Sequence, residues 1–113
     1  MTSEEQPKCD FCSSKHVTWS YPCRDFIHRP QKKLRRYVPD FGSKGGWAAC
    51  DRCHALIEGD DWPQLAEISA RTHPQHHVVP MRFLRPLVRG LHKDFAANQT
   101  GPAIHIMTTL RRT

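Results

Sequence analysis

Two cysteine pairs are the residues of this sequence whose type and spacing can carry chemistry. They are Cys9-Asp-Phe-Cys12 and Cys50-Asp-Arg-Cys53, and residues 13–49 separate them. Each C-x₂-C pair can present two sulfurs to one metal ion, and two pairs supply the four-sulfur tetrahedron that zinc prefers. A single C-x-x-C is ambiguous because redox motifs share the spacing, but two pairs in a small chain indicate a metal site. We therefore predict one structural Zn²⁺ ion bound by Cys9, Cys12, Cys50 and Cys53.

Three other chemistries use the same residue types. The run Cys50-Asp-Arg-Cys53-His54 matches the C-x-x-C-H of covalent c-type haem attachment, but such attachment takes place outside the cytoplasm and leaves the first pair idle. A dithiol redox centre needs only one of the two pairs. A zinc deaminase needs H-x-E with P-C-x-x-C, and the sequence contains no H-x-E. Structural zinc accounts for more of the residues than any of these.

An HNH-type metal-dependent nuclease is the enzymatic alternative. The second cysteine pair with His54 resembles the corresponding pair of such nucleases, and His76-His-Val-Val-Pro80 resembles their catalytic histidine strand. That strand should lie between the two cysteine pairs, whereas here it follows both. We therefore expect a protein without enzymatic activity.

The composition describes one small domain with tails. The chain has 113 residues, of which 38% are hydrophobic, below the usual range of about 45–50%. With so modest a core, we expect a metal cross-link to supply part of the stability. No apolar run approaches the length of about 18 residues that a membrane span needs. The acidic, polar residues 1–7 are the opposite of a signal peptide, so we expect a cytoplasmic protein with reduced cysteines.

The charge pattern indicates the kind of partner. The formal net charge is +6, or about +4 with one zinc ion on four thiolates. Two basic segments, at 24–36 and 82–112, surround an acidic stretch at 58–67. This pattern predicts contact with nucleic acid or with an acidic protein surface, and indicates neither a membrane nor a small-molecule substrate. The candidate contact residues are Arg29, Lys32, Lys33, Arg35, Arg36 and Tyr37 in a loop and Arg85 and Arg89 on a helix.

Short strands are expected to position the cysteine pairs. Residues 1–8 should be disordered. Alternating side chains predict a half-buried strand at 16–21, and we expect residues 23–28 to pair back on it as a hairpin. The Pro- and Gly-rich segment 29–46 is predicted to be a mobile loop with a strand fragment at 34–38. A further short strand at 46–49 leads into the second cysteine pair.

Helices follow the second cysteine pair. The first is predicted to end at Gly59 as a left-handed cap, and Asp60 or Asp61 should cap the next, which begins at Trp62. Apolar residues at three- and four-residue steps predict a basic amphipathic helix at 81–97, which Pro86 kinks or begins. A last edge strand is expected at 103–107. We divide the chain into a zinc-finger domain at 9–71, a linker at 72–80, and a basic helix with tail at 81–113.

This order of knuckle, hairpin and helix resembles the treble-clef zinc finger, or more broadly the zinc-ribbon-like folds in which four cysteines bind the ion. In the treble clef the last two ligands come from the first turn of an α-helix, and the resemblance covers residues 9–58. The chain also resembles a group of small actinobacterial proteins that carry C-x₂-C, an aromatic-rich strand and G-W-x-x-C-x₂-C. These likenesses imply a small zinc-stabilised α+β domain and no particular activity.

The remaining Cys, His and Trp residues are assigned to packing or to solvated segments. Cys23 is expected to be a small buried side chain rather than a fifth ligand. His54 should lie beside the metal site; the alternative is that it replaces one of the cysteines as a ligand. The linker histidines are read as solvated rather than as a second metal site; they are His73, His76 and His77. The three tryptophans are expected to pack in the core, unless one is exposed and stacks on a base; they are Trp19, Trp47 and Trp62.

The sequence therefore predicts a non-enzymatic zinc-binding adaptor. It would contact nucleic acid or the transcription machinery through the basic loop 29–37 and the basic helix 82–93. The first alternative is a protein–protein interaction module that binds an acidic partner. The second is the HNH-like nuclease.

Overall fold

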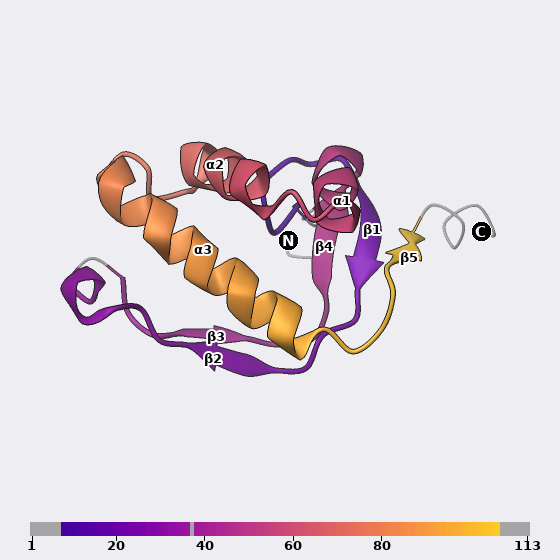
Figure 1. The fold of residues 1–113 in the computed structure, drawn as a ribbon, viewed down its shortest axis with the longest axis horizontal. Coiled ribbons are helices and arrows are strands. Elements are labelled where there is room, and N and C mark those ends of the chain that lie inside the picture. Colours follow the sequence, from indigo (N-terminus) through magenta and orange to yellow (C-terminus); the bar gives the residue numbers. More distant parts are fainter. Residues whose placement is uncertain (1–7, 37, 107–113) are drawn as a thin grey trace, which may run out of the picture.

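Three helices and two small antiparallel sheets make up the fold, which confirms the expected α+β class (Figure 1). The structure is a computed structural model and describes residues 8–36 and 38–106. Within this part of the chain, none of the helices has the length and hydrophobicity that crossing a bilayer requires. The elements in order are β1 (Val17–Tyr21), β2 (Phe26–His28), the 3₁₀ turn η2 (Lys32–Leu34), β3 (Phe41–Ser43), β4 (Trp47–Cys50), α1 (Asp51–Glu58), α2 (Trp62–Thr72), α3 (Met81–Asn98) and β5 (Ile104–His105).

The first sheet has the strand order β4-β1-β5. Its central strand β1 places Tyr21 opposite Trp47 of β4 and Trp19 opposite His105 of β5. Tyr21 is fully buried, as the alternation of the sequence predicts for one face of this strand. The three strands predicted at 16–21, 46–49 and 103–107 are therefore confirmed, each within a few residues. Because β1 follows the first cysteine pair and β4 ends at the first cysteine of the second, this pairing brings the two pairs toward each other.

The predicted pairing of residues 23–28 with β1 is wrong. β2 pairs with β3 instead, with Phe26 opposite Ser43 and His28 opposite Phe41. Both edges of β1 are already taken by β4 and β5, and Pro22 has no N–H with which to continue the ladder. The chain therefore leaves the first sheet and forms a separate hairpin that lies beside α3 (Figure 1).

The strand fragment predicted at 34–38 is also wrong. The described part of this segment forms the 3₁₀ turn η2, closed by the Leu34 N–H donating to the Gln31 carbonyl at 2.8 Å. Leu34 is 1% exposed and belongs to the same apolar cluster as Leu84 and Val88 of α3. Leu34 thus anchors the basic loop to α3. Tyr37 and the predicted disordered residues 1–7 lie outside the described residues.

The three helices are confirmed, with one correction at a cap. The Asp61 carboxylate accepts a hydrogen bond from the Gln64 N–H and caps α2. Gly59 does not adopt the predicted left-handed conformation, since its φ is −88°, and Asp60 adopts it instead with φ 58°. The Gly59 N–H still binds the helix carbonyls of α1, so the chain reverses one residue later. α3 continues through Pro86.

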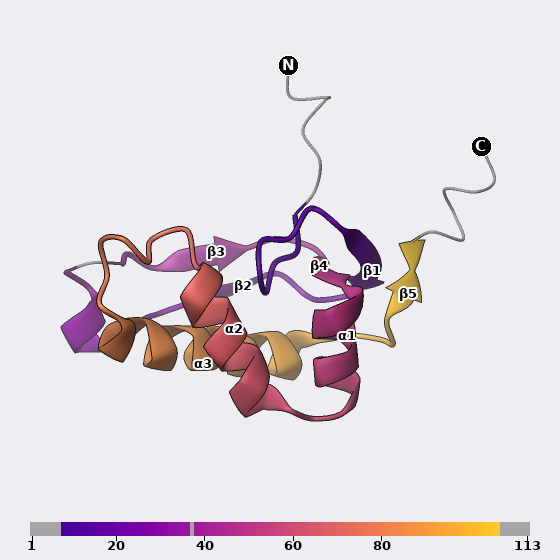
Figure 2. The same ribbon diagram turned by 90° about the horizontal axis from the view of Figure 1, so that it is seen from above.

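Two apolar clusters form the core. The first surrounds the cysteines and contains Phe11, Tyr21, Trp47 and also Phe95 of α3. The second lies between α2, α3 and Leu34. α2 crosses α3 (Figure 2), and α3 also contacts β2. The tryptophans pack as predicted, with Trp47 buried and the other two half-buried against the first cluster.

Candidate metal centre

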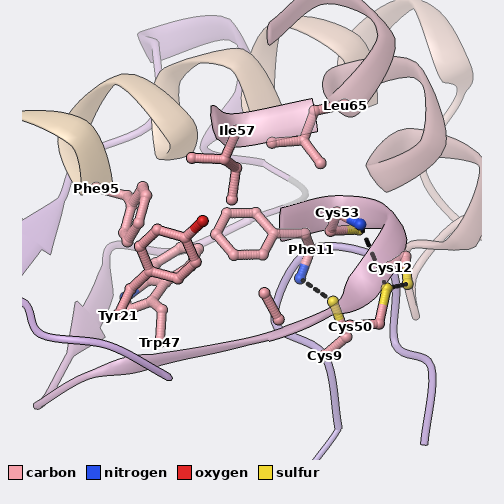
Figure 3. Packing of buried hydrophobic residues seen from close by; sticks show 11 residues of the cluster. Cys9, Phe11, Cys12, Tyr21, Trp47, Cys50, Cys53, Ile57, Leu65 and Phe95 are labelled. Carbon is pink, nitrogen blue, oxygen red and sulfur yellow. Dashed lines mark hydrogen bonds between the residues drawn. The ribbon is translucent and has the colours of Figure 1, made fainter. Parts of the chain in front are cut away.

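The four cysteines of the two pairs meet at one place (Figure 3). Their Sγ atoms all lie within 4.8 Å of one another, and the Sγ atoms of Cys12 and Cys50 are 3.6 Å apart. All four residues are at most 6% exposed. Four sulfurs bound to zinc at about 2.3 Å have separations of about 3.8 Å in a tetrahedron. The cluster is therefore compatible with one tetrahedral zinc ion.

The first pair is held by a tight turn. The Ser13 N–H donates to the Cys9 carbonyl at 2.8 Å, and the Cys9 N–H donates to the Ser14 carbonyl at 2.7 Å. Ser13 adopts a left-handed φ of 67°, which reverses the chain directly after Cys12. The Phe11 N–H points at the Cys9 Sγ from 3.4 Å. The turn thus presents two sulfurs and directs a backbone dipole at one of them.

A reciprocal pair of hydrogen bonds joins this turn to the strand before the second pair. The Asp10 N–H donates to the Ala48 carbonyl at 2.8 Å, and the Ala48 N–H donates to the Asp10 carboxylate at 2.7 Å. Burial raises the pKa of the Asp10 carboxyl group. Because Asp10 lies between two of the cysteines and Ala48 lies two residues before a third, these bonds bring the four sulfurs together. Asp10 was not among the residues predicted from the sequence.

The second pair lies at the start of α1. Cys50 is the N-cap residue, and its Sγ accepts from the Cys53 N–H at 3.5 Å. The free amide groups and positive end of a helix dipole stabilise thiolate charge. Arg52, inside this pair, places a cation beside the site. A hydrogen bond to the Cys12 sulfur raises the pKa of its guanidinium. Its charge would offset part of the net −2 of a zinc ion bound by four thiolates; Arg52 was not among the residues predicted from the sequence.

The sulfurs interact strongly with one another. A hydrogen bond from the Cys53 thiol lowers the pKa of Cys9 to about 5, and the same bond raises the pKa of Cys53. Burial raises the pKa of Cys12. Four buried thiolates this close repel one another, and a divalent cation among them removes that cost. The donor set is thus suited to a thiolate-binding metal such as zinc.

The other two candidate ligands lie outside this group. The half-buried Cys23 directs its thiol at the Phe95 carbonyl at 3.9 Å, which is a packing contact. His54 stacks on Trp19 with a ring-centroid distance of 3.7 Å, and its Nδ1 lies 2.8 Å from the Tyr21 hydroxyl. Neither joins the four-cysteine group. His54 instead ties α1 to β1.

The candidate contact residues differ in their surroundings. Arg85 is held by two bonds to the Glu67 carboxylate, of 2.9 and 3.1 Å, whereas Arg89 is exposed. In the loop, Arg35 donates to the Pro30 carbonyl. The exposed cations of the loop are Arg29, Lys32, Lys33, Arg35 and Arg36.

The segment that resembles a nuclease strand forms turns. Residues 74–79 have no strand pairing, and His76 and His77 are exposed, with their ring centroids 3.8 Å apart. No metal-binding group that includes them is present among the residues that the structure describes.

Comparison with known proteins adds no relative. The chain matches no protein-family model, and no curated protein and no solved structure matches it. The likeness to the actinobacterial group therefore rests only on the sequence features named above.

Proposed function

We propose that the protein is a non-enzymatic binding module whose treble-clef-like core is held by one structural zinc ion. The four buried cysteine sulfurs within 4.8 Å of one another carry this proposal. Four protein ligands leave zinc no open position for a substrate or a catalytic water. The treble-clef assignment is supported by the tight turn at 9–12 and by the origin of Cys50 and Cys53 at the start of α1.

The partner that we propose is nucleic acid. Five exposed cations in the basic loop and on α3 have no ion pair within the described part of the chain; they are Arg29, Lys32, Lys33, Arg89 and Lys93. Leu34 packs the loop against α3, so these cations belong to adjoining elements. Exposed lysine and arginine side chains that form no ion pair with an acidic side chain are suited to phosphate contacts.

The zinc is tested by elemental analysis of the purified protein together with Cys53→Ser. We expect about one zinc per chain and a variant that does not fold, because zinc binding supplies folding free energy. Cys23→Ser is the control, since Cys23 is half-buried and outside the cluster, and it should keep both fold and zinc. Folded protein without bound metal would show the proposal to be wrong.

Nucleic-acid binding is tested by fluorescence anisotropy with labelled DNA and RNA. Affinity should fall steeply between about 50 and 200 mM salt as counterions rebind the phosphates. The double variant Lys32→Gln/Lys33→Gln should weaken binding and reduce the salt slope. Lys15→Gln/Lys44→Gln, which removes the same charge elsewhere on the surface, should have less effect. Absence of binding at low salt would leave an acidic protein as the partner class, and plasmid cleavage with Mg²⁺, Mn²⁺ or Ni²⁺ would favour the nuclease.

A further inference from the structure

A pocket of about 420 Å³ lies where the start of α2 meets the second half of α3. Its volume is within the range of about 300–1,000 Å³ that is typical of small-ligand sites. It lies apart from the cysteine cluster, since none of the four cysteines lines it. The lining residues are Trp62, Pro63, Ala66, Arg89, His92, Lys93 and Ala96.

The walls are apolar and the rim is positive. Trp62, Pro63 and the two alanines supply the apolar surface. Arg89 and Lys93 are exposed and lie about 6 Å apart along the helix axis, four residues at 1.5 Å each. Within the described residues neither cation forms an ion pair, and no acidic side chain lines the pocket. An apolar group that carries a negative charge next to it matches both features.

His92 adds a polar group to the wall. It is 5% exposed, and its Nε2 lies 3.2 Å from the Ser69 hydroxyl. Its Nδ1 is buried and has no hydrogen-bond partner in the described part of the chain, which is a costly arrangement for a polar atom. Burial lowers the pKa of His92 to about 4, so the ring is neutral near pH 7 and Nδ1 is a donor or an acceptor according to its tautomer.

Trp62 is available to stack. It is half-buried, and its nearest aromatic neighbours, His92 and Phe95, have ring centroids 6.2 and 6.4 Å away in tilted orientations. Its indole N–H donates to Asp60, outside the pocket. Trp62 thus packs against the first apolar cluster and also lines the pocket, so it is the tryptophan to which the stacking alternative of the sequence analysis applies.

We propose that this pocket accepts one base of a single-stranded nucleic acid, which stacks on Trp62 while Arg89 and Lys93 contact the adjoining phosphates. This inference rests on the nucleic-acid role proposed above and specifies the strand form. A base has a flat face and a polar edge with donors and acceptors, and each base is joined to a phosphate charge. An acidic peptide side chain has no such face. In a duplex the bases are stacked and paired, so they enter such a pocket only at a cost.

The test compares a fluorescent single strand of about 12 nucleotides with the duplex of the same sequence. The matched variants are Ala96→Glu, which places a carboxylate in the pocket, and Ala97→Glu, which places it on the same helix outside the pocket; both alanines are exposed. We expect the single strand to bind more tightly than the duplex. Ala96→Glu should weaken single-strand binding by about tenfold or more, equivalent to about 1.4 kcal/mol, and Ala97→Glu much less.

Substitutions of the stacking ring and the rim complete the test. Trp62→Leu should weaken single-strand binding by about 5- to 150-fold, the range for loss of one stacked base, while Trp62→Phe keeps most of the affinity. Arg89→Gln should weaken it more than Arg82→Gln, because the exposed Arg82 lies over the Phe83 ring and does not line the pocket. If Trp62→Leu fails to fold, Ala96→Glu and Ala97→Glu still test the pocket, because both alanines lie on the surface.

The two proposals can fail separately. Equal affinity for single strand and duplex, or equal effects of Ala96→Glu and Ala97→Glu, would overturn the pocket inference. If Lys32→Gln/Lys33→Gln still weakened binding in that case, the general nucleic-acid role would stand. Absence of any nucleic-acid binding at low salt would overturn both. Tighter binding of a peptide containing Glu and Phe than of the single strand, with loss in Ala96→Glu, would also overturn the base assignment.

Discussion

At the scale of single residues, buried polar side chains determine most of the unusual chemistry. The Sγ atoms of Cys9 and Cys53 belong to a buried four-sulfur cluster, and His92 has one ring nitrogen without a hydrogen-bond partner among the described residues. His28 is 7% exposed, and its Nδ1 lies 2.7 Å from the Asp94 carboxylate. Such groups cost free energy when they lose a partner or gain a charge. The direction in which their substitution changes the free energy of unfolding can therefore be predicted.

His92 should make the protein less stable in mild acid. Its folded-state pKa of about 4 is below the usual value of about 6.5, so the unfolded chain binds the proton first as pH falls. The free energy of unfolding should therefore decrease between about pH 6.5 and 4, by at most about 1.4 kcal/mol per pH unit from this group. Above pH 6.5 this group should have no effect.

The measurement is urea denaturation at pH 7.5 and 5.5 for the natural protein and for His92→Leu. The variant lacks the titrating group and should lose less stability between the two pH values. Zinc content measured at each pH separates this effect from release of the metal, which is common to both proteins. Equal pH dependence in the two proteins would contradict the assignment of this loss of stability to His92.

At the scale of elements, α3 packs closely against the β2–β3 hairpin at Gly90. A Cβ added at Gly90 would lie 2.9 Å from Cε1 of the His28 ring. The ring cannot move away cheaply, because it is buried and bonded to Asp94 one turn along α3. Glycine inside a helix is unfavourable by about 1 kcal/mol relative to alanine. The close approach of β2 therefore explains why position 90 is a glycine, although glycine is unfavourable inside a helix.

Gly90→Ala should consequently depend on residue 28. In the natural protein the new methyl group meets the His28 ring, and the substitution should destabilise or give no gain. In a His28→Ala background the ring is absent, and Gly90→Ala should stabilise by about 1 kcal/mol. Chemical denaturation of the four proteins of this double-mutant cycle measures the difference. The same effect in both backgrounds would show that the contact is unimportant.

At the scale of the whole molecule, the four-cysteine cluster and the helical layer share one core. Phe11, between the cysteines of the first pair, contacts Phe95 of α3 with ring centroids 5.3 Å apart. Leu65 of α2 belongs to the same cluster. The second basic segment is thus built partly on the core that the cysteines close. Loss of the proposed metal should therefore destabilise the whole described chain rather than only the region near the sulfurs.

Removal of the proposed zinc ion should therefore unfold α3 together with the cysteine region. Zinc contributes about 10–16 kcal/mol in small zinc fingers, comparable with or larger than the usual net stability of about 5–15 kcal/mol. Helical circular dichroism and tryptophan fluorescence should be lost together during titration with a chelator, and both should return when zinc is added back. Retention of the helical signal after complete metal removal would contradict a shared core.

The sequence by itself determined the features that depend on local pattern. The spacing of the cysteine pairs indicated the donor set, the candidate capping residues at 59–61 indicated where α1 ends and α2 begins, and apolar periodicity located α3 within a few residues. Asp61 was recognised as one of two possible caps because capping involves only the next few residues. These predictions succeeded because hydrogen bonds inside a helix and ligands within one turn join residues close in the chain.

Only the tertiary structure decided which distant segments meet. It pairs β2 with β3 rather than with β1, joins Asp10 to Ala48 beside the four cysteines, and brings Trp62, Arg89 and Lys93 together around one pocket. Each of these depends on which edges and faces remain free after the other elements have packed. A single sequence records the hydrophobic pattern of a strand or a helix but not its partner, so these contacts became visible only in three dimensions.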